Sequence, residues 1–264
     1  LAQILILYQF GNRGVGAILS TGMLSANALH VFDVSEEKCK FYAQKGLVVE
    51  PSNRALVTHC EVLFLAVKPQ MVETVLGEIA GLTDEKCMVS IAAGVPIARL
   101  RKALGENTYF VRVMPNTPLL VQQGATVIAA PDQIADAYLD LIVSVFRAAG
   151  MVEFLPEEKI NAVIPVSSSS PAFFFRMVRA MAESGERNGI PYDTALRLAI
   201  ATMNGAAHIL AESGKTPDEL IKQVSSPGGT TIAALSAFDE LKFETLIDEA
   251  FSRCIHRAEE LGAN

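Results

Sequence analysis

The first half of the chain alternates short apolar runs with stretches of helical periodicity, and this alternation restricts the possible folds more than any other feature. Val62–Val67 contains only apolar residues, so we predict a strand that is buried on both faces. Further strands are predicted at Ile4–Tyr8, Ala28–Phe32, Leu47–Val49, Met88–Ala92, Tyr109–Val113 and Ala125–Ala129. The helices between them are predicted at residues 14–23, 35–45, 70–80 and 97–104. Doubly buried strands that alternate with helices indicate an α/β fold with a mostly parallel sheet covered on both faces.

The pattern changes near Phe154–Pro156, and beyond this point we predict helices only. They cover residues 157–166, 171–188, 192–213, 217–224, 230–238 and 243–262, with breaks at glycine and proline. The chain of 264 residues therefore divides into a sheet domain over 1–155 and an all-helical domain over 156–264. Half of the residues are hydrophobic, which is a large apolar fraction. We therefore expect the helical domain to bury apolar surface between subunits.

Charge and cysteine content exclude several classes of partner. The formal net charge is -7 and no Lys/Arg cluster stands out, which argues against nucleic acid and anionic membranes. No apolar run approaches the roughly 20 residues of a membrane span, and the first residues lack the basic start of a signal peptide. The four cysteines and four histidines are scattered without ligand spacing. We therefore expect reduced thiols, no metal site and a cytoplasmic location.

A glycine-rich turn follows the first predicted strand and is a candidate for binding a dinucleotide. The fingerprint of such sites is G-x-G-x-x-G, in which the second glycine admits the pyrophosphate and the third lets the helix pack on the strand. Here Gln9 replaces the first glycine, whereas Gly11 and Gly14 occupy the other two positions. Amides around Gly11, Asn12, Arg13 and Gly14 can still bind phosphate at a helix N-terminus. A plain strand–helix turn explains the same residues.

Asp33 ends the second predicted strand, about 20 residues after the glycine turn, where dinucleotide sites carry an acidic residue. Such a carboxylate binds the ribose hydroxyls of NAD and repels the 2′-phosphate of NADP. The segment Asp33–Glu36 also has the pattern of a helix start, with Asp33 as the N-cap. Both interpretations stay open, and the first predicts a preference for NADH over NADPH.

Two further motifs are candidates for the substrate end of the site. In Val224–Thr231, two glycines leave backbone amides bare where a helix is predicted to begin, which suits a carboxylate or a phosphate. The hydroxyls of Thr230 and Thr231 can bind a ligand or cap the helix, and a simple capped turn is the alternative. In Met114–Pro118, two prolines fix an extended loop at the carboxyl end of the sheet, as part of a ligand site or as a rigid connector.

Five segments together are similar to one known family. Ala66–Pro69, Ser90–Val95, Arg112–Pro118, Ser167–Phe173 and Val224–Thr231 resemble the motifs of pyrroline-5-carboxylate reductase, in order and spacing, over nearly the whole chain. The resemblance implies a Rossmann-type N-terminal domain, NADPH or NADH as cofactor, and reduction of the C=N bond of 1-pyrroline-5-carboxylate to L-proline. It also implies homodimers formed through an all-α C-terminal dimerisation domain, with decamers as a higher assembly.

The resemblance and the fingerprint together assign roles to individual residues. The residues predicted to bind the cofactor are Gly11, Asn12, Arg13, Gly14, Asp33, Asn53, Ala66, Val67, Lys68, Pro69, Ala93 and Asn116. Those predicted to bind the substrate are Val224, Ser226, Gly228, Gly229, Thr230 and Thr231. The resemblance implies that main-chain amides of this loop hold the substrate carboxylate and that the Thr231 hydroxyl faces the ring nitrogen as the catalytic side chain. The substrate motif contains no His, Lys, Asp or Glu, so the nitrogen either arrives protonated or receives a proton from water through Thr231.

Several positions depart from the family pattern. Gln9 and Arg13 stand where the family has Gly and Met, Ser168 and Ser170 replace glycines, and Phe173 replaces Tyr. These changes keep two alternatives open. One is a degenerate paralogue that binds a metabolite or nucleotide without turnover. The other is a reductase similar to β-hydroxyacid dehydrogenases, which present a lysine from the helical domain as the acid.

Overall fold

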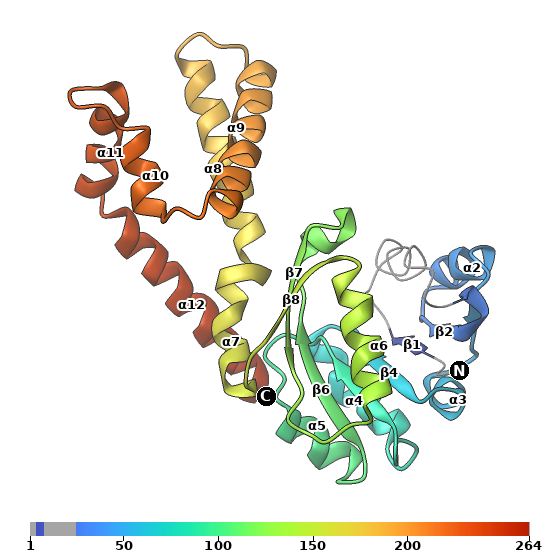
Figure 1. Ribbon diagram of the computed structural model, residues 1–264. Coiled ribbons are helices and arrows are strands. Elements are labelled where there is room, and N and C mark those ends of the chain that lie inside the picture. Colours follow the sequence, from blue (N-terminus) through green and yellow to red (C-terminus); the bar gives the residue numbers. More distant parts are fainter. Residues whose placement is uncertain (1–3, 8–24, 264) are drawn as a thin grey trace. The chain divides into compact units, whose positions relative to one another are not determined.

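The structure is a computed structural model that describes residues 4–7 and 25–263. Within these residues, eight strands form one sheet in the order β3-β2-β1-β4-β5-β6-β7-β8 (Figure 1). They are β1 (Ile4–Leu7), β2 (Leu29–Phe32), β3 (Val48–Val49), β4 (Val62–Leu65), β5 (Cys87–Ser90), β6 (Tyr109–Met114), β7 (Gly124–Ala129) and β8 (Gly150–Phe154). The strands β1 to β6 run parallel, whereas β7 is antiparallel to β6 and β8 is parallel to β7. The predicted α/β class with a mostly parallel sheet is confirmed.

Helices connect the parallel strands and then make up the C-terminal part of the chain. In the described residues they are α2 (Glu36–Gln44), α3 (Asn53–His59), α4 (Val72–Ile79), α5 (Ile97–Leu104), α6 (Asp136–Arg147), α7 (Ile160–Val163), α8 (Ser170–Arg187), α9 (Tyr192–Glu212), α10 (Pro217–Gln223), α11 (Thr230–Glu240) and α12 (Phe243–Ala263). A π-helical turn, Ile164–Ser168, separates α7 from α8. The all-helical C-terminal part is confirmed, whereas the predicted helix over residues 14–23 lies outside the described residues.

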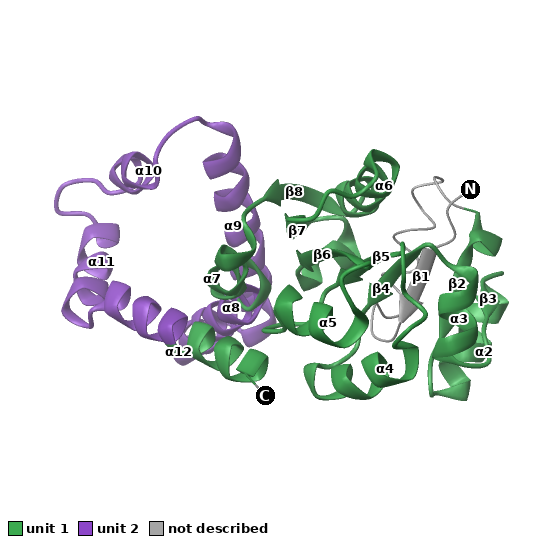
Figure 2. Ribbon diagram, turned by 90° about the horizontal axis from the view of Figure 1, so that it is seen from below, with its two compact units in different colours: residues 1–169, 253–264 green, residues 170–252 purple. Residues whose placement is uncertain are grey.

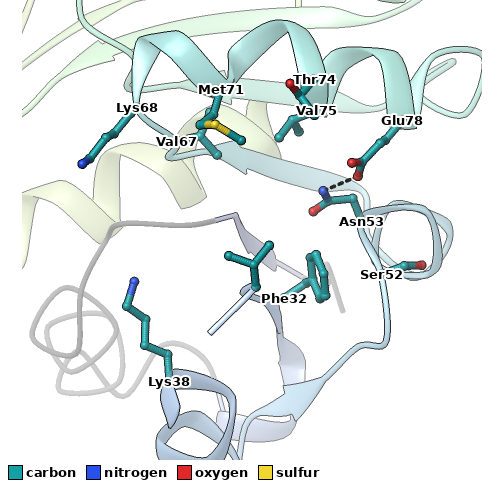
Figure 3. Close-up of a pocket in the computed structure, with 11 residues that line it drawn as sticks. Phe32, Lys38, Ser52, Asn53, Val67, Lys68, Met71, Thr74, Val75 and Glu78 are labelled. Atoms are coloured by element: carbon teal, nitrogen blue, oxygen red, sulfur yellow. Dashed lines mark hydrogen bonds between the residues drawn. The ribbon is translucent and has the colours of Figure 1, made fainter. Parts of the chain in front are cut away.

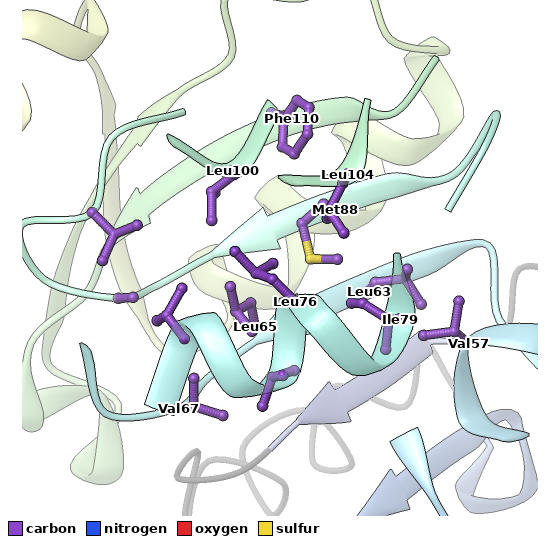
Figure 4. Close-up of a cluster of buried hydrophobic side chains, with 14 of the residues drawn as sticks. Val57, Leu63, Leu65, Val67, Leu76, Ile79, Met88, Leu100, Leu104 and Phe110 are labelled. Atoms are coloured by element: carbon purple, nitrogen blue, oxygen red, sulfur yellow. The ribbon is translucent and has the colours of Figure 1, made fainter. Parts of the chain in front are cut away.

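The side chains of strand β4 pack against the helices on both faces of the sheet. All four of its side chains are buried. Val62 and Phe64 join a cluster with α6 on one face, whereas Leu63 and Leu65 join a second cluster with α4 and α5 on the other (Figure 4). Successive residues of a strand point to opposite faces. This wholly apolar strand therefore stabilises both layers, at about 1.5–3 kcal/mol for each fully buried side chain.

The chain forms two compact units (Figure 2). Unit 1 contains residues 1–169 and 253–264 and includes the sheet, and unit 2 contains residues 170–252. The last strand of the sheet ends at Phe154, next to the boundary that the sequence predicts between residues 155 and 156. The assignment of 1–155 to the cofactor, and of 156–264 to substrate binding and dimerisation, stays a prediction.

Within unit 1, the last turns of α12 pack directly on the loop that follows β5. Gly94 in this loop has a φ of +81°, and a Cβ atom there would collide with the carbonyl oxygen of Ala258. A Cβ atom on Gly262 would in turn collide with the Gly94 carbonyl oxygen. The Arg99 guanidinium donates to the carbonyl oxygen of Leu261 at 3.3 Å, close to the end of the helix. Close backbone contact therefore holds the loop after β5 in place.

Unit 2 contains the long helices α8 and α9, which pack closely against each other. A Cβ atom on Gly185 of α8 would lie 2.8 Å from the Cβ of Ala195 on α9. Many large apolar side chains of this unit stay exposed: Phe174, Phe175, Met177, Met181, Leu198, Ile200, Ile209, Leu210, Ile232, Phe238 and Leu246. None of the helices in the described part of the chain combines the length and the apolar character needed to cross a bilayer.

Candidate active site

The carboxyl ends of the parallel strands bring most of the predicted cofactor residues to one edge of the sheet. Asp33 follows β2, Ala66–Pro69 follows β4, Ala93 follows β5 and Asn116 follows β6. The last residues of β2, β1, β4 and β5 lie side by side in the register of the sheet. Ligands of open α/β sheets bind at this edge, where the strand order reverses next to β1. The residues Gly11, Asn12, Arg13 and Gly14 follow β1 and lie outside the described residues.

A cavity of about 730 Å³ opens at this edge, between the end of β2, the start of α3 and the segment from β4 to α4 (Figure 3). Among the predicted residues, Asn53, Val67 and Lys68 line it. Lys38 and Met71 line it as well, although no motif in the sequence marked them. The volume lies within the range of small-molecule sites in proteins, so the cavity is a candidate for one part of a dinucleotide.

Asp33 is almost fully buried, with 3 % of its surface exposed. Its Oδ1 accepts a hydrogen bond from the Ser35 amide at 2.8 Å, and its Oδ2 pairs with Lys38 Nζ at 3.0 Å. The N-cap of α2 is Ser35, whose hydroxyl accepts from the Lys38 amide. The interpretation of Asp33 as the N-cap is therefore wrong, because its carboxylate bonds the amide of Ser35 and the helix begins after that residue. The positive charge of Lys38 offsets part of the negative charge of the Asp33 carboxylate.

Asn53 is held rigidly where it lines the cavity. It is the first residue of α3, and Ser52 caps this helix by accepting a hydrogen bond from the Ala55 amide at 3.1 Å. The Asn53 side chain donates through Nδ2 to Glu78 Oε2 on α4 at 2.7 Å (Figure 3). Asn53 is 6 % exposed, so this bond to Glu78 fixes the orientation of its amide. No sequence signal identified Glu78, because the contact depends on the packing of two helices.

The Asn116 side chain forms hydrogen bonds with two backbone groups of the protein. Its Nδ2 donates to the carbonyl oxygen of Ser167 at 3.1 Å, and its Oδ1 accepts from the Ala125 amide at 2.9 Å. The Ser168 hydroxyl donates to the carbonyl oxygen of Pro115 at 3.1 Å. The loop after β6 is thus tied to the π-helical turn. In this conformation Asn116 shapes the sheet edge, and direct contact with a cofactor stays a prediction.

Replacing Asn116 with alanine should lower the free energy of unfolding by about 1–3 kcal/mol, because it removes the partly buried hydrogen bonds to the Ser167 carbonyl and the Ala125 amide. Urea unfolding at fixed protein concentration measures this loss. The control is Asn107→Ala at an exposed turn position, for which we expect a change within about 0.5 kcal/mol. Equal effects of the two variants would show that the Asn116 bonds do not stabilise the loop.

The predicted substrate residues lie in unit 2, in the turn between α10 and α11 and in the first two residues of α11. The Gly229 amide donates to the carbonyl oxygen of Ser226 at 2.9 Å, and Gly228 has a φ of +71°. With Pro227 before it, this is the pattern of a type II turn, which requires glycine at its third position. A side chain on Gly229 would also lie too close to the Ser226 carbonyl, at 2.9 Å. The backbone conformation of the turn therefore requires glycine at both positions of the motif.

The first amides of helix α11 have no partner within the helix. Gly229 is its N-cap, and no side chain among the described residues caps it. The amide of Ala233 bonds the Gly229 carbonyl oxygen at 3.3 Å, whereas the amides of the first turn, including those of Thr230 and Thr231, have no partner within the helix. Neither threonine hydroxyl therefore caps the helix, whereas the simple turn and the ligand site both stay open as interpretations. The Ser225 hydroxyl oxygen is buried beside this turn and has no hydrogen-bond partner in the described part of the chain.

Comparison with known proteins extends the resemblance along the chain. Residues 157–261 match the family model "Pyrroline-5-carboxylate reductase dimerisation", and residues 10–94 match "NADP oxidoreductase coenzyme F420-dependent". The chain is 36% identical to the pyrroline-5-carboxylate reductase of Pseudomonas aeruginosa over 249 residues, which is 94% of this chain and 91% of that protein.

Solved structures agree with this comparison. A pyrroline-5-carboxylate reductase from Coxiella burnetii aligns with a TM-score of 0.87 and 30% identity over 98% of both chains. The pyrroline carboxylate reductase of Plasmodium falciparum, solved with NADP bound, aligns with a TM-score of 0.90 over 99% of this chain and 98% of that chain. Its identity is 22%, which shows a shared fold. Because the chain is 36% identical to a curated relative over 94% of its own length, it belongs to the pyrroline-5-carboxylate reductase family.

Proposed function

We propose that this chain is a pyrroline-5-carboxylate reductase, which reduces the C=N bond of 1-pyrroline-5-carboxylate to give L-proline, the last step of proline synthesis. The observation that carries the proposal is the 36% identity to a curated enzyme of this name over 94% of the chain. The substrate turn supports it, since its proline and glycines adopt the conformation that leaves the amides of α11 bare. In this reaction a hydride and a proton add across the C=N bond.

The described residues fit a nicotinamide dinucleotide, either NADPH or NADH. The cavity at the carboxyl edge of the sheet is lined by two cationic side chains, Lys38 and Lys68, and by the fixed amide of Asn53 (Figure 3). Cationic groups at this edge suit the phosphates of the cofactor, and an amide side chain can bond the ribose hydroxyls. When bound, the reduced nicotinamide supplies the hydride. The loops Ala66–Pro69 and Ala93–Gly94, both at the same edge, would flank it.

In this reaction the residues of the chain position the substrate and take part in proton transfer. The free amides at the start of α11, together with the helix dipole, would bind the substrate carboxylate without a basic side chain. The Ser225 hydroxyl beside the turn, which has no partner among the described residues, offers one more donor. We assign to the half-buried Thr231 the hydroxyl that bonds the ring nitrogen and holds a proton there. No carboxylate or imidazole lies in this motif, so water is the source of any proton that the nitrogen does not already carry.

Turnover with both cofactors tests the proposal. The purified chain should oxidise NADPH or NADH only when 1-pyrroline-5-carboxylate is added, and proline should accumulate in equal amount. Binding of cofactor and proline without turnover would instead support the non-catalytic paralogue. Activity only with a β-hydroxyacid and oxidised cofactor would support the dehydrogenase alternative.

The choice between the two cofactors should depend on Asp33. Asp33→Asn removes the charge that opposes a 2′-phosphate and breaks the ion pair with Lys38. The ratio of kcat/KM for NADPH to kcat/KM for NADH should therefore rise by about 5- to 30-fold, which corresponds to about 1–2 kcal/mol. The ratio compares two cofactors on one variant, so a loss of stability affects both values alike. An unchanged ratio, or a strong NADPH preference in the unaltered chain, would remove Asp33 from cofactor selection.

We further propose that the chain forms a homodimer through its helical unit and works in the cytoplasm. The family model matched over 157–261 is described as a dimerisation region, and unit 2 exposes many large apolar side chains. All four cysteines are free thiols, which suits a reducing compartment. Light scattering should give twice the mass of one chain, or ten times that mass if five dimers assemble. A monomer at micromolar concentration would contradict the proposal.

A further inference from the structure

Three potential metal ligands from separate elements of unit 1 converge at one point. His30 lies on β2, Glu50 follows β3, and His59 is the last residue of α3. The two imidazoles face the same carboxylate oxygen, with His30 Nδ1 at 2.7 Å and His59 Nδ1 at 2.9 Å from Glu50 Oε1. The candidate ligand atoms of the three residues all lie within 4.8 Å of one another. We propose that His30, Glu50 and His59 bind one divalent transition-metal ion, with Zn²⁺ as the representative ion.

The donor atoms define the class of ion. Two imidazole nitrogens and one carboxylate oxygen form a ligand set that suits Zn²⁺, Co²⁺ and Ni²⁺, whereas Mg²⁺ and Ca²⁺ prefer oxygen ligands throughout. The neighbouring Cys60 does not join the set, because only His30, Glu50 and His59 have ligand atoms that all lie within 4.8 Å of one another. The three residues therefore supply three ligands, and the fourth position of a tetrahedral ion is left for water.

Burial and access also fit a bound ion. His30 and Glu50 are each 7 % exposed, so two ligands are held within the protein. The side chain of His59 is 53 % exposed, which leaves a path from solvent. The buried His30 ring has no partner for Nε2 in the described part of the chain. Its position therefore depends on the group that Nδ1 contacts.

A simple His–Glu ion pair would explain one histidine but not the second. His59 is a surface residue that water could solvate, and yet its Nδ1 is directed at the oxygen that already contacts His30. The two rings are tilted by 42° with centroids 5.8 Å apart, so they do not stack on each other. An ion between the three groups would fasten β2, the end of β3 and α3 together. The first residue of α3, Asn53, lines the cofactor cavity.

Metal titration of the full-length chain, freed of metal by a chelator, tests the site. We expect one equivalent of Zn²⁺ per chain in competition with a chromophoric chelator. Co²⁺ in its place should give the visible absorption of a four-coordinate ion with nitrogen and oxygen ligands. The variants His59→Gln and Glu50→Gln should each weaken binding roughly 100-fold or more, at least the loss seen when the support of a metal ligand is removed.

The matched control is His256→Gln. His256 also pairs with a carboxylate, with Nε2 at 3.2 Å from Glu260 Oε1, but on an exposed helix face outside the three-residue cluster. This variant should bind Zn²⁺ as the unaltered chain does. The proposal is overturned if the chain binds less than one equivalent, or if His59→Gln binds the ion as tightly as the control. His59 is half-exposed, so its replacement should not unfold the chain, and a melting curve checks this.

Discussion

Replacing Gly94 with alanine is expected to lower the free energy of unfolding by about 2–6 kcal/mol. Two costs add at this position. The backbone has a φ of +81°, a conformation that costs an L-residue about 1–3 kcal/mol. The new Cβ atom would also collide with the Ala258 carbonyl oxygen of α12, and such overpacking costs about 1–3 kcal/mol. Urea unfolding at fixed protein concentration measures the sum.

Two other glycines separate these costs. Gly105 has a φ of +95° but open space around it, so Gly105→Ala should show the conformational cost alone, about 1–3 kcal/mol. Gly77 lies within α4 with nothing near it, so Gly77→Ala should stabilise the chain by about 0.5–1 kcal/mol. If Gly94→Ala were no worse than Gly105→Ala, the contact between the loop after β5 and α12 would not be close in solution.

Replacing Thr231 with alanine is expected to lower kcat/KM for 1-pyrroline-5-carboxylate by about 5- to 150-fold. This corresponds to a loss of about 1–3 kcal/mol of transition-state stabilisation. The hydroxyl forms no hydrogen bond that caps α11, so its removal should leave the turn folded. If the hydroxyl bonds the nitrogen mainly in the transition state, kcat falls more than KM rises.

Two neighbouring substitutions control this experiment. Thr231→Ser keeps the hydroxyl and should restore most of the activity. Thr230→Ala removes an exposed hydroxyl of the same turn and should change kcat/KM little, because the proposed carboxylate contacts come from the backbone. An unchanged kcat/KM for Thr231→Ala would exclude this side chain from the reaction.

The strands β1 to β7 were predictable because each is a short apolar run with clear borders. Strand β4 is the plainest case, since burial on both faces demands an uninterrupted apolar sequence. Helix α3 was missed because its seven residues are too few to show a helical period. The strand β8 was missed because it is short and its side chains are largely exposed, which leaves little apolar signal.

The site was predictable where a residue follows a strand or lies in a contiguous motif. Asp33, Lys68 and Asn116 are found at the sheet edge because parallel strands share that edge. Their partners were not predictable, since the Asn53–Glu78 bond and the Asn116–Ser167 bond join segments far apart in the chain. The same reason explains why scattered histidines indicated no metal site.

The most direct test of the proposed reaction follows the hydride. The chain is given NADPH or NADH deuterated at C4 of the nicotinamide, in the reactive position, together with 1-pyrroline-5-carboxylate. The proline formed should carry one deuterium on the ring carbon that belonged to the C=N bond. Proline without deuterium, or no proline while both cofactors are bound, would contradict direct hydride transfer by this protein.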